Sequence, residues 1–181
     1  ILQDGYVSSA ETFPLTGPSN IAMGDYTATV YPAVTGLSIT SANATATLSL
    51  DGIKNLIYDG RVNATGSTPD LVISNTNFGT SPAIRFINDA NNNTFKYCKI
   101  HSRNNSTSSG TIFFGTTTGT NGNDNNKIEY CDIFDGTSTP FNAIYATGTT
   151  TTTNHFNSNN TISNCNIYNY FNAAGLDCGI N

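Results

Sequence analysis

The sequence has no tryptophan, one methionine and little charge, since only 10 % of its 181 residues are Asp, Glu, Lys or Arg, against about 25 % in ordinary soluble domains. Strong helix formers such as Glu, Lys, Gln and Arg are therefore scarce, which disfavours a helical fold. No apolar run approaches the roughly 20 residues that a membrane-spanning helix needs. The seven Lys and Arg residues are scattered over a chain of net charge −5, so we expect neither nucleic acid nor an anionic membrane as partner.

Metal ligands and cofactor motifs are also scarce. The chain has two histidines, and its four cysteines, at positions 98, 131, 165 and 178, form no Cys-x-x-Cys pair. Zinc binding is therefore not expected, and we predict no metal site and no cofactor.

Small polar residues dominate what remains. The 26 Asn, 28 Thr, 16 Ser and 16 Gly residues together make up 86 of the 181 positions. Thr, Ile, Phe and Tyr favour strands, whereas Asn and Gly favour turns, so the balance indicates an all-β fold with many tight turns. A disordered linker could share this composition, but 37 % hydrophobic residues in alternating runs such as 83–87 argue against one.

An internal repeat is the strongest signal in the sequence. Residues 93–100, 126–133 and 160–167 align without gaps on the pattern Asn-x-[Ile/Phe]-x-x-Cys-x-Ile, at offsets of 33 and 34 residues, and 55–62 is a looser copy. A second set of strand-like segments lies between the copies, at 47–50, 83–86, 111–114, 143–146 and 175–178. A unit of several short strands that recurs at roughly 30-residue spacing is typical of a solenoid.

Parallel stacking of the units predicts columns of equivalent residues at the strand spacing of about 4.8 Å. Ile57, Phe95, Ile128 and Ile162 are expected in one inner column and Val62, Ile100, Ile133 and Ile167 in another. The bend that separates them falls on Tyr97, Tyr130 and Asn164, where a left-handed backbone is expected.

Two further columns are predicted to be structural. Cys98, Cys131 and Cys165 should stack as free, buried thiols, because parallel side chains point the same way and cannot face each other as a disulfide requires. Cys178 is expected to be unpaired, in a different column with Phe86, Phe114 and Ala146. Asn93, Asn126 and Asn160 recur in phase and are expected to bond to one another through their amides.

These phased Asn-Asn-x-Ile-x-x-Cys-x-Ile units resemble the pectin-lyase-like right-handed parallel β-helix. More closely, they are similar to the Asn/Thr-rich repeat modules of large secreted surface proteins of Bacteroidota. The resemblance implies about four to five coils over residues 39–181, continuing beyond the C-terminus as a fragment of a longer solenoid. Residues 1–38 are expected to form an N-terminal strand, cap or degenerate coil. The implied location is extracellular or at the cell surface.

Polysaccharide-cleaving β-helix enzymes need acidic groups in pairs or around Ca²⁺. The Asn-Thr-Asp, Asp-Asp and Gly-His-Gly motifs of the related hydrolases do not occur here, so we predict no catalytic residues. The isolated carboxylates Asp4, Asp51, Asp59 and Asp135 are interpreted as turn residues. Lys96 over Glu129 and Lys99 over Asp132 are expected to form cross-strand ion pairs.

Outward aromatic residues are the better functional clue. If Ile84, Ile112, Ile144 and Leu176 point inward, alternation turns outward a column that consists of Arg85, Phe113, Tyr145 and Asp177. We predict that this column binds glycans, because flat rings pack against sugars; the alternative is that Thr-rich loops cover it. His101, Phe134 and Tyr168 form a second outward set, although His101 and His155 are both expected to be solvated.

Three functions fit these observations to different degrees. The favoured one is a non-catalytic structural or adhesive module of a secreted cell-surface protein, glycan-binding or filament-forming. Its partners would be extracellular glycans, or its own chain and neighbouring copies at the open solenoid end. The alternative is a polysaccharide lyase or glycoside hydrolase whose active coils lie outside this segment. An ice-binding solenoid is disfavoured, since Thr-x-Thr does not recur in phase.

Overall fold

The computed structural model describes residues 1–17, 26–138, 140–149, 151–170 and 178–180, and within them the chain forms three parallel sheets of five strands each. The first sheet, in spatial order, consists of β1 (Ala28–Val30), β4 (Leu56–Asp59), β7 (Thr94–Lys96), β10 (Lys127–Glu129) and β13 (Thr161–Ser163). The second consists of β2 (Ser38–Ser41), β5 (Val72–Gly79), β8 (Lys99–Asn104), β11 (Asp132–Asp135) and β14 (Asn166–Ile167). The third consists of β3 (Leu48–Asp51), β6 (Ile84–Ile87), β9 (Ile112–Phe114), β12 (Asn142–Ala146) and β15 (Cys178–Ile180).

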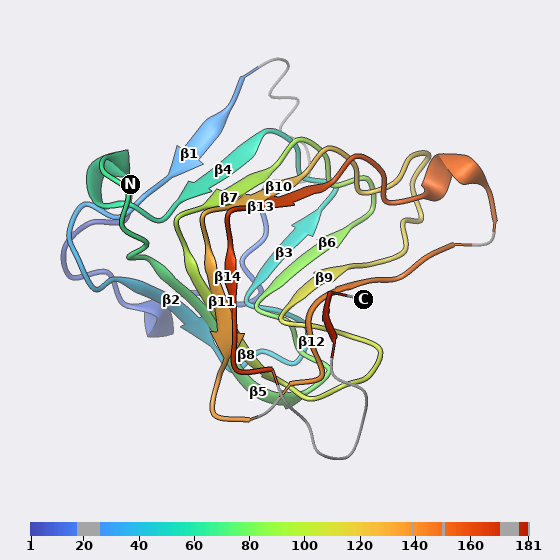
Figure 1. Cartoon of the computed structure of the whole chain (residues 1–181). Helices are drawn as coiled ribbons and strands as arrows, with labels where there is room; N and C mark the ends of the chain where they lie inside the picture. The colour runs from blue at the N-terminus through green and yellow to red at the C-terminus, as the bar shows by residue number, and fades with distance from the viewer. Residues whose placement is uncertain (18–25, 139, 150, 171–177, 181) are drawn as a thin grey trace.

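The chain visits the three sheets in turn, so each strand pairs in parallel with the strand three places later. Figure 1 shows the three sheets around a shared interior, with successive coils stacked on one another. The predicted all-β parallel solenoid is therefore confirmed, with about four coils. Short 3-10 helices lie in the connections: η1 (Ser8–Ala10), η2 (Val62–Ala64) and η3 (Thr153–His155). No helix among the described residues is long and apolar enough to cross a membrane.

Columns of apolar side chains fill the interior. Phe95, Ile128 and Ile162 are paired in register on the first sheet, as predicted. The largest columns belong to the other two sheets: Ile39, Ile73, Ile100, Ile133 and Ile167 on the second, and Leu48, Ile84, Ile112 and Ile144 on the third. Burying each such side chain stabilises the fold by about 1.5–3 kcal/mol, so regular apolar spacing is what holds the coils in register.

The register predicted for the loosest repeat copy, 55–62, is wrong by one residue. Tyr58, not Ile57, pairs with Phe95, and their rings stack at 5.0 Å with an interplanar angle of 3°. Val62 lies in η2 and is replaced in its predicted column by Ile73. The inner positions of these two sheets are five residues apart in Phe95 and Ile100 but fifteen apart in Tyr58 and Ile73, because this coil carries an additional loop.

Sharp bends connect the first sheet to the second through single residues with left-handed backbone. Tyr97, Tyr130 and Asn164 have φ of 53°, 54° and 53°, as predicted for the bend. A left-handed tyrosine costs about 1–2 kcal/mol. The Tyr97 and Tyr130 rings stack at 4.9 Å with an interplanar angle of 5°, a contact that offsets part of this cost.

Asparagine side chains satisfy the turn that precedes the first sheet. The Oδ1 of Asn126 accepts hydrogen bonds from the backbone N–H and the Nδ2 of Asn93 at 3.1 and 3.0 Å, and Asn160 does the same for Asn126 at 2.9 and 3.1 Å. Each Nδ2 also donates to a backbone carbonyl one coil back, such as Ala90 O for Asn126 at 2.9 Å. Both ends of the amide are thus used at every step of this ladder.

A second asparagine ladder lies on the far side of the same turn. Asn157 Oδ1 accepts from the backbone N–H and Nδ2 of Asn123 at 3.1 and 2.8 Å, and Asn123 Oδ1 accepts from the Ala90 N–H at 3.1 Å. The sequence indicated that asparagine runs recur here, but it did not separate the two ladders.

Replacing Asn126 by alanine is expected to lower the free energy of unfolding by about 2–4 kcal/mol. The change leaves the buried N–H of Asn93 and carbonyl of Ala90 without partners, and each unsatisfied buried group costs about 1–3 kcal/mol. Urea denaturation followed by circular dichroism measures the loss. Asn154→Ala, at an exposed position in η3, is the control and should stay within about 0.5 kcal/mol. Equal effects of the two substitutions would contradict the ladder's structural role.

Candidate functional site

Three of the four residues predicted to bind glycans form one outward column on the third sheet. Arg85 pairs with Phe113, and Phe113 with Tyr145. All three are partly exposed, whereas Ile84, Ile112 and Ile144 beside them are at most 2 % exposed. The Phe113 and Tyr145 rings stack with centroids 6.1 Å apart and an interplanar angle of 23°. The predicted register of this strip is therefore confirmed for its first three members.

The fourth member was placed by a wrong alignment. Ile144 pairs with Ile180 and Asn142 with Cys178, so Cys178 does not lie level with Ala146 as predicted. The predicted alignment was the only reason to place Asp177 beside Tyr145, so that placement is no longer supported. Asp177 itself lies outside the described residues. The repeat copy 160–167 precedes β15, but Ile167 and Ile180 are thirteen residues apart whereas Ile133 and Ile144 are eleven apart, so a constant offset misplaced the register.

A depression of about 310 Å³ opens between Arg85 and Phe113. Its walls carry hydroxyl-bearing residues from the loops before the strands, among them Thr45, Thr80 and Ser108. Since Tyr145 covers one face of Phe113, the other face is turned towards the coil that carries Arg85. An aromatic wall beside several hydroxyls and a guanidinium is suited to a polar ring-shaped ligand.

Arg85 retains unused hydrogen-bonding capacity. Its Nε and Nη2 both donate to Ser49 Oγ, at 3.2 and 3.0 Å, and among the described residues it has no carboxylate within ion-pair distance. Burial lowers the pKa of Arg85, although Asp51 opposes this shift. A partly desolvated guanidinium with free donors favours an anionic or hydroxyl-rich partner.

The Thr-rich loop after β9 is anchored away from the strip. Thr117 Oγ1 donates to Asp89 at 2.6 Å, and Thr118 Oγ1 donates to Asn88 at 2.8 Å. These bonds hold residues 116–118 against the preceding coil and leave Phe113 partly exposed. The Thr-rich loop at 149–153 is only partly within the described residues.

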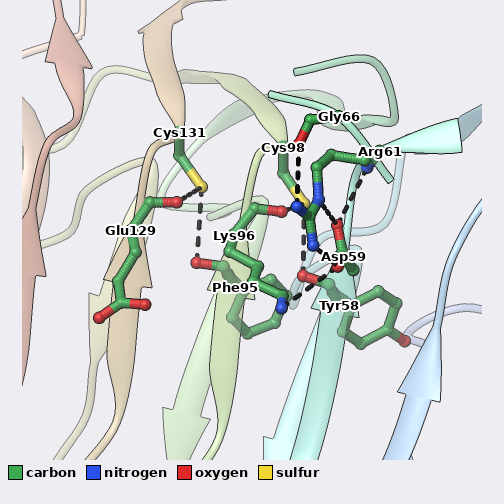
Figure 2. Close-up of polar contacts among 9 residues, drawn as sticks. All are labelled: Tyr58, Asp59, Arg61, Gly66, Phe95, Lys96, Cys98, Glu129 and Cys131. Atoms are coloured by element: carbon green, nitrogen blue, oxygen red, sulfur yellow. Dashed lines mark hydrogen bonds and ion pairs between the residues drawn. The ribbon is translucent and has the colours of Figure 1, made fainter. Parts of the chain in front are cut away.

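The three repeat cysteines are free thiols, as the parallel register predicts. Each sulfur lies between a carbonyl of its own coil and one of the preceding coil (Figure 2). Cys98 Sγ is 3.4 Å from Lys96 O and 3.8 Å from Tyr58 O, and Cys131 Sγ is 3.4 Å from Glu129 O and 3.6 Å from Phe95 O. Burial raises the pKa of Cys131 well above its ordinary value, so this thiol has little nucleophilic character. Cys165, in the last described coil, is partly exposed rather than buried as predicted, because no further coil among the described residues covers it.

The predicted ion pairs on the first two sheets are not formed as expected. Lys96 and Glu129 do lie side by side in register, but Lys96 Nζ binds Asp59 Oδ2 at 3.2 Å instead. Figure 2 shows Lys96 reaching to Asp59 while the Glu129 side chain extends away from it. Asp132, expected to pair with Lys99, accepts a hydrogen bond from Asn166 Nδ2 at 2.8 Å.

Asp59 is the centre of a charged cluster that sequence reasoning missed. It is 2 % exposed, and its carboxylate accepts Nε and Nη2 of Arg61 at 2.8 and 2.6 Å. Arg61 also donates to Gly66 O at 2.9 Å and lies over the Tyr97 ring, 4.5 Å from its centroid. The cluster thus fastens the additional loop of this coil to the first sheet. The one-residue misalignment of 55–62 hid it, because the correct register pairs Asp59 with Lys96 directly.

The charge state of Asp59 follows from these contacts. Burial by itself would raise the pKa of the Asp59 carboxyl, but the hydrogen bonds from Arg61 and the charge and hydrogen bond of Lys96 outweigh it and lower the pKa. The carboxylate is engaged by two cations, which suits structural support better than proton transfer. Within the part of the chain that the structure describes, no group of three or more His, Cys, Asp or Glu side chains could hold a metal ion.

The fold defines the class of this protein as a parallel β-solenoid. Comparison with protein-family models, with curated proteins and with solved structures finds no match to the chain. Its function therefore has to be argued from its own surface.

Replacing Asp59 by asparagine is expected to lower the free energy of unfolding at pH 7 by about 1–3 kcal/mol, since both cations lose a charged partner. Because the folded-state pKa is lowered, the wild-type advantage should be complete above pH values near 5. It should then decline as the pH falls below the ordinary carboxyl pKa of about 3.9. Denaturation at pH 7, 4 and 2.5 measures the gap between the two proteins. Asp4→Asn, at an exposed position, is the matched control, and a gap that stays constant down to pH 2.5 would refute the assignment.

Proposed function

We propose that this chain is a non-catalytic structural and adhesive segment of a secreted or cell-surface protein, and that it binds glycans through Arg85, Phe113 and Tyr145. The observation that carries the proposal is the partly exposed aromatic column beside a guanidinium that has no carboxylate partner among the described residues. Aromatic rings bury the apolar faces of sugars, while arginine bonds to hydroxyl or carboxylate oxygens. Such a combination needs no reacting group.

The mechanical part of the proposal rests on the interior. An Ile column joins all five strands of the second sheet, and two asparagine ladders and a column of free thiols add contacts between the later coils, so we expect the module to resist bending. Rigid stacks of this kind suit stalks, adhesins and filaments. The finer relationship to pectin-lyase-like helices, and to Asn/Thr-rich surface modules of Bacteroidota, belongs to this proposal and is supported by the motifs of the repeat alone.

A glycan array is the direct test. Phe113→Ala and Tyr145→Ala should each weaken binding of the recognised glycans about 5- to 10-fold, because a ring contact of about 1 kcal/mol is lost. Arg85→Lys keeps the positive charge but removes the planar guanidinium with its paired N–H donors, so it should weaken binding as well. The control is Phe156→Ala, which removes an aromatic side chain that is 45 % exposed outside the strip. Unchanged binding by all three strip variants would exclude this column as the site.

The non-catalytic part is tested with uronic-acid polymers. Incubation of the purified chain with pectin or alginate, with and without Ca²⁺, should release neither reducing ends nor unsaturated products. The physical reason is that Asp59, the carboxylate most enclosed by charge, is bound by two cations rather than poised as an acid or base. Product release by this chain would support the alternative of a polysaccharide lyase or hydrolase. Denatured chain serves as the blank.

A further inference from the structure

A second aromatic column runs along the outer face of the second sheet. His101 pairs with Phe134, and the Tyr168 N–H bonds to Ile133 O at 3.1 Å, which places Tyr168 next in line. Ring centroids are 4.9 Å apart for His101 and Phe134 and 5.3 Å apart for Phe134 and Tyr168. The three parallel rings form one continuous apolar ridge over adjacent coils, of which Tyr168 is 43 % exposed.

A groove of about 520 Å³ follows this ridge. The three rings form one wall, and Asp135, Thr137 and Asn169 contribute polar groups at the strand ends. Asp135 has neither an ion pair nor a hydrogen bond to its carboxylate among the described residues. The groove therefore combines an aromatic wall with the carboxylate of Asp135, which has no partner among the described residues. It lies on the second sheet, whereas the Arg85 strip lies on the third.

His101, in the same wall, contains a polar atom that has no hydrogen-bond partner among the described residues. Contrary to the expectation of a solvated side chain, it is only partly exposed. Its Nδ1 is buried without a hydrogen-bond partner in the described part of the chain. Burial lowers the pKa of His101 despite the opposing charge of Asp135, so the ring is neutral at physiological pH. Buried polar atoms normally have a partner.

We propose that this groove is a binding site for an uncharged, hydroxyl-rich saccharide. A carboxylate accepts hydrogen bonds only, so the ligand has to donate them, and sugar hydroxyls do so. The C–H surface of a pyranose packs against the face of the Tyr168 ring that Phe134 does not cover. Asp135 repels uronic acids, whereas Arg85 on the third sheet attracts them, so the two faces select different sugars.

The stacking geometry argues against a cation bound over the Phe134 ring. An ammonium group is attracted to the face of a ring. Both faces of Phe134 are covered, one by His101 and the other by Tyr168, and the ring edge that remains is the positive part of the quadrupole. Oxygen-bearing ligands meet this edge more favourably than lysine or a quaternary amine.

Calorimetric titration of the whole chain with cellohexaose, laminarihexaose and maltohexaose tests the proposal. At least one of the three should bind, and Tyr168→Ala and Asp135→Asn should each weaken it at least 5-fold. Phe156→Ala, which removes an exposed ring outside both strips, is the matched control and should change the affinity less than 2-fold. Tyr168→Ala and Asp135→Asn leave the Arg85 strip intact, so failure of the Arg85 proposal leaves this result unaffected.

A backbone amide NMR titration of the wild-type chain keeps the test independent of variants that fold poorly. Bound hexasaccharide should shift the amides of Asp135, Thr137 and Asn169. The proposal is overturned if none of the three hexasaccharides binds at millimolar concentration, or if the shifts lie elsewhere. It is equally overturned if an oligogalacturonate or a lysine-rich peptide binds this groove more tightly than they do.

Discussion

Parallel, in-register stacking is the constraint on which the rest of this molecule depends. Each described strand bonds to the strand one coil away, so the backbone of a coil is satisfied only by its neighbours. The tight turns between sheets cannot join these ladders through backbone groups alone. The side-chain amides of Asn93, Asn126 and Asn160 supply the missing bonds, because each has an N–H donor and a carbonyl acceptor that can bond to adjacent coils. An amide does this without charge, which explains why asparagine rather than aspartate recurs at this position.

The same constraint determines what the side chains can do. Equivalent residues lie one strand spacing apart and point the same way, so cysteines stack without bonding and aromatic rings stack face to face. On the outer surface this converts single aromatic residues into ridges that cross several coils. The binding surfaces that we propose are accordingly columns rather than single residues. An arginine lies beside one ridge and an aspartate beside the other.

Where one coil departs from the repeat, other contacts join it to the next coil. The coil that contains β4 lacks the cysteine of the later coils and carries an additional loop. In place of the thiol column it has the stacked pair of Tyr58 and Phe95 and the Asp59 cluster. Lys96 pairs with Asp59 rather than Glu129: Asp59 is enclosed by Arg61 and the loop, whereas the Glu129 side chain extends away from Lys96 (Figure 2). A partner in a desolvated setting is the stronger one for a cation.

The sequence by itself determined the solenoid, the inner columns of the three well-matched repeats, the left-handed bends and the outward position of Arg85, Phe113 and Tyr145. Cysteine and asparagine at fixed offsets fix the register there, and alternation follows from the register. Only the tertiary structure decided the pairing of Tyr58 with Phe95 and of Ile144 with Ile180, because the copy at 55–62 is loose and the connection before β15 is longer than the one before β12. It alone also revealed the Asp59 cluster and the groove beside Asp135. Both assemble residues from different coils around loops of irregular length, and a linear pattern carries no information about which loop closes over which carboxylate.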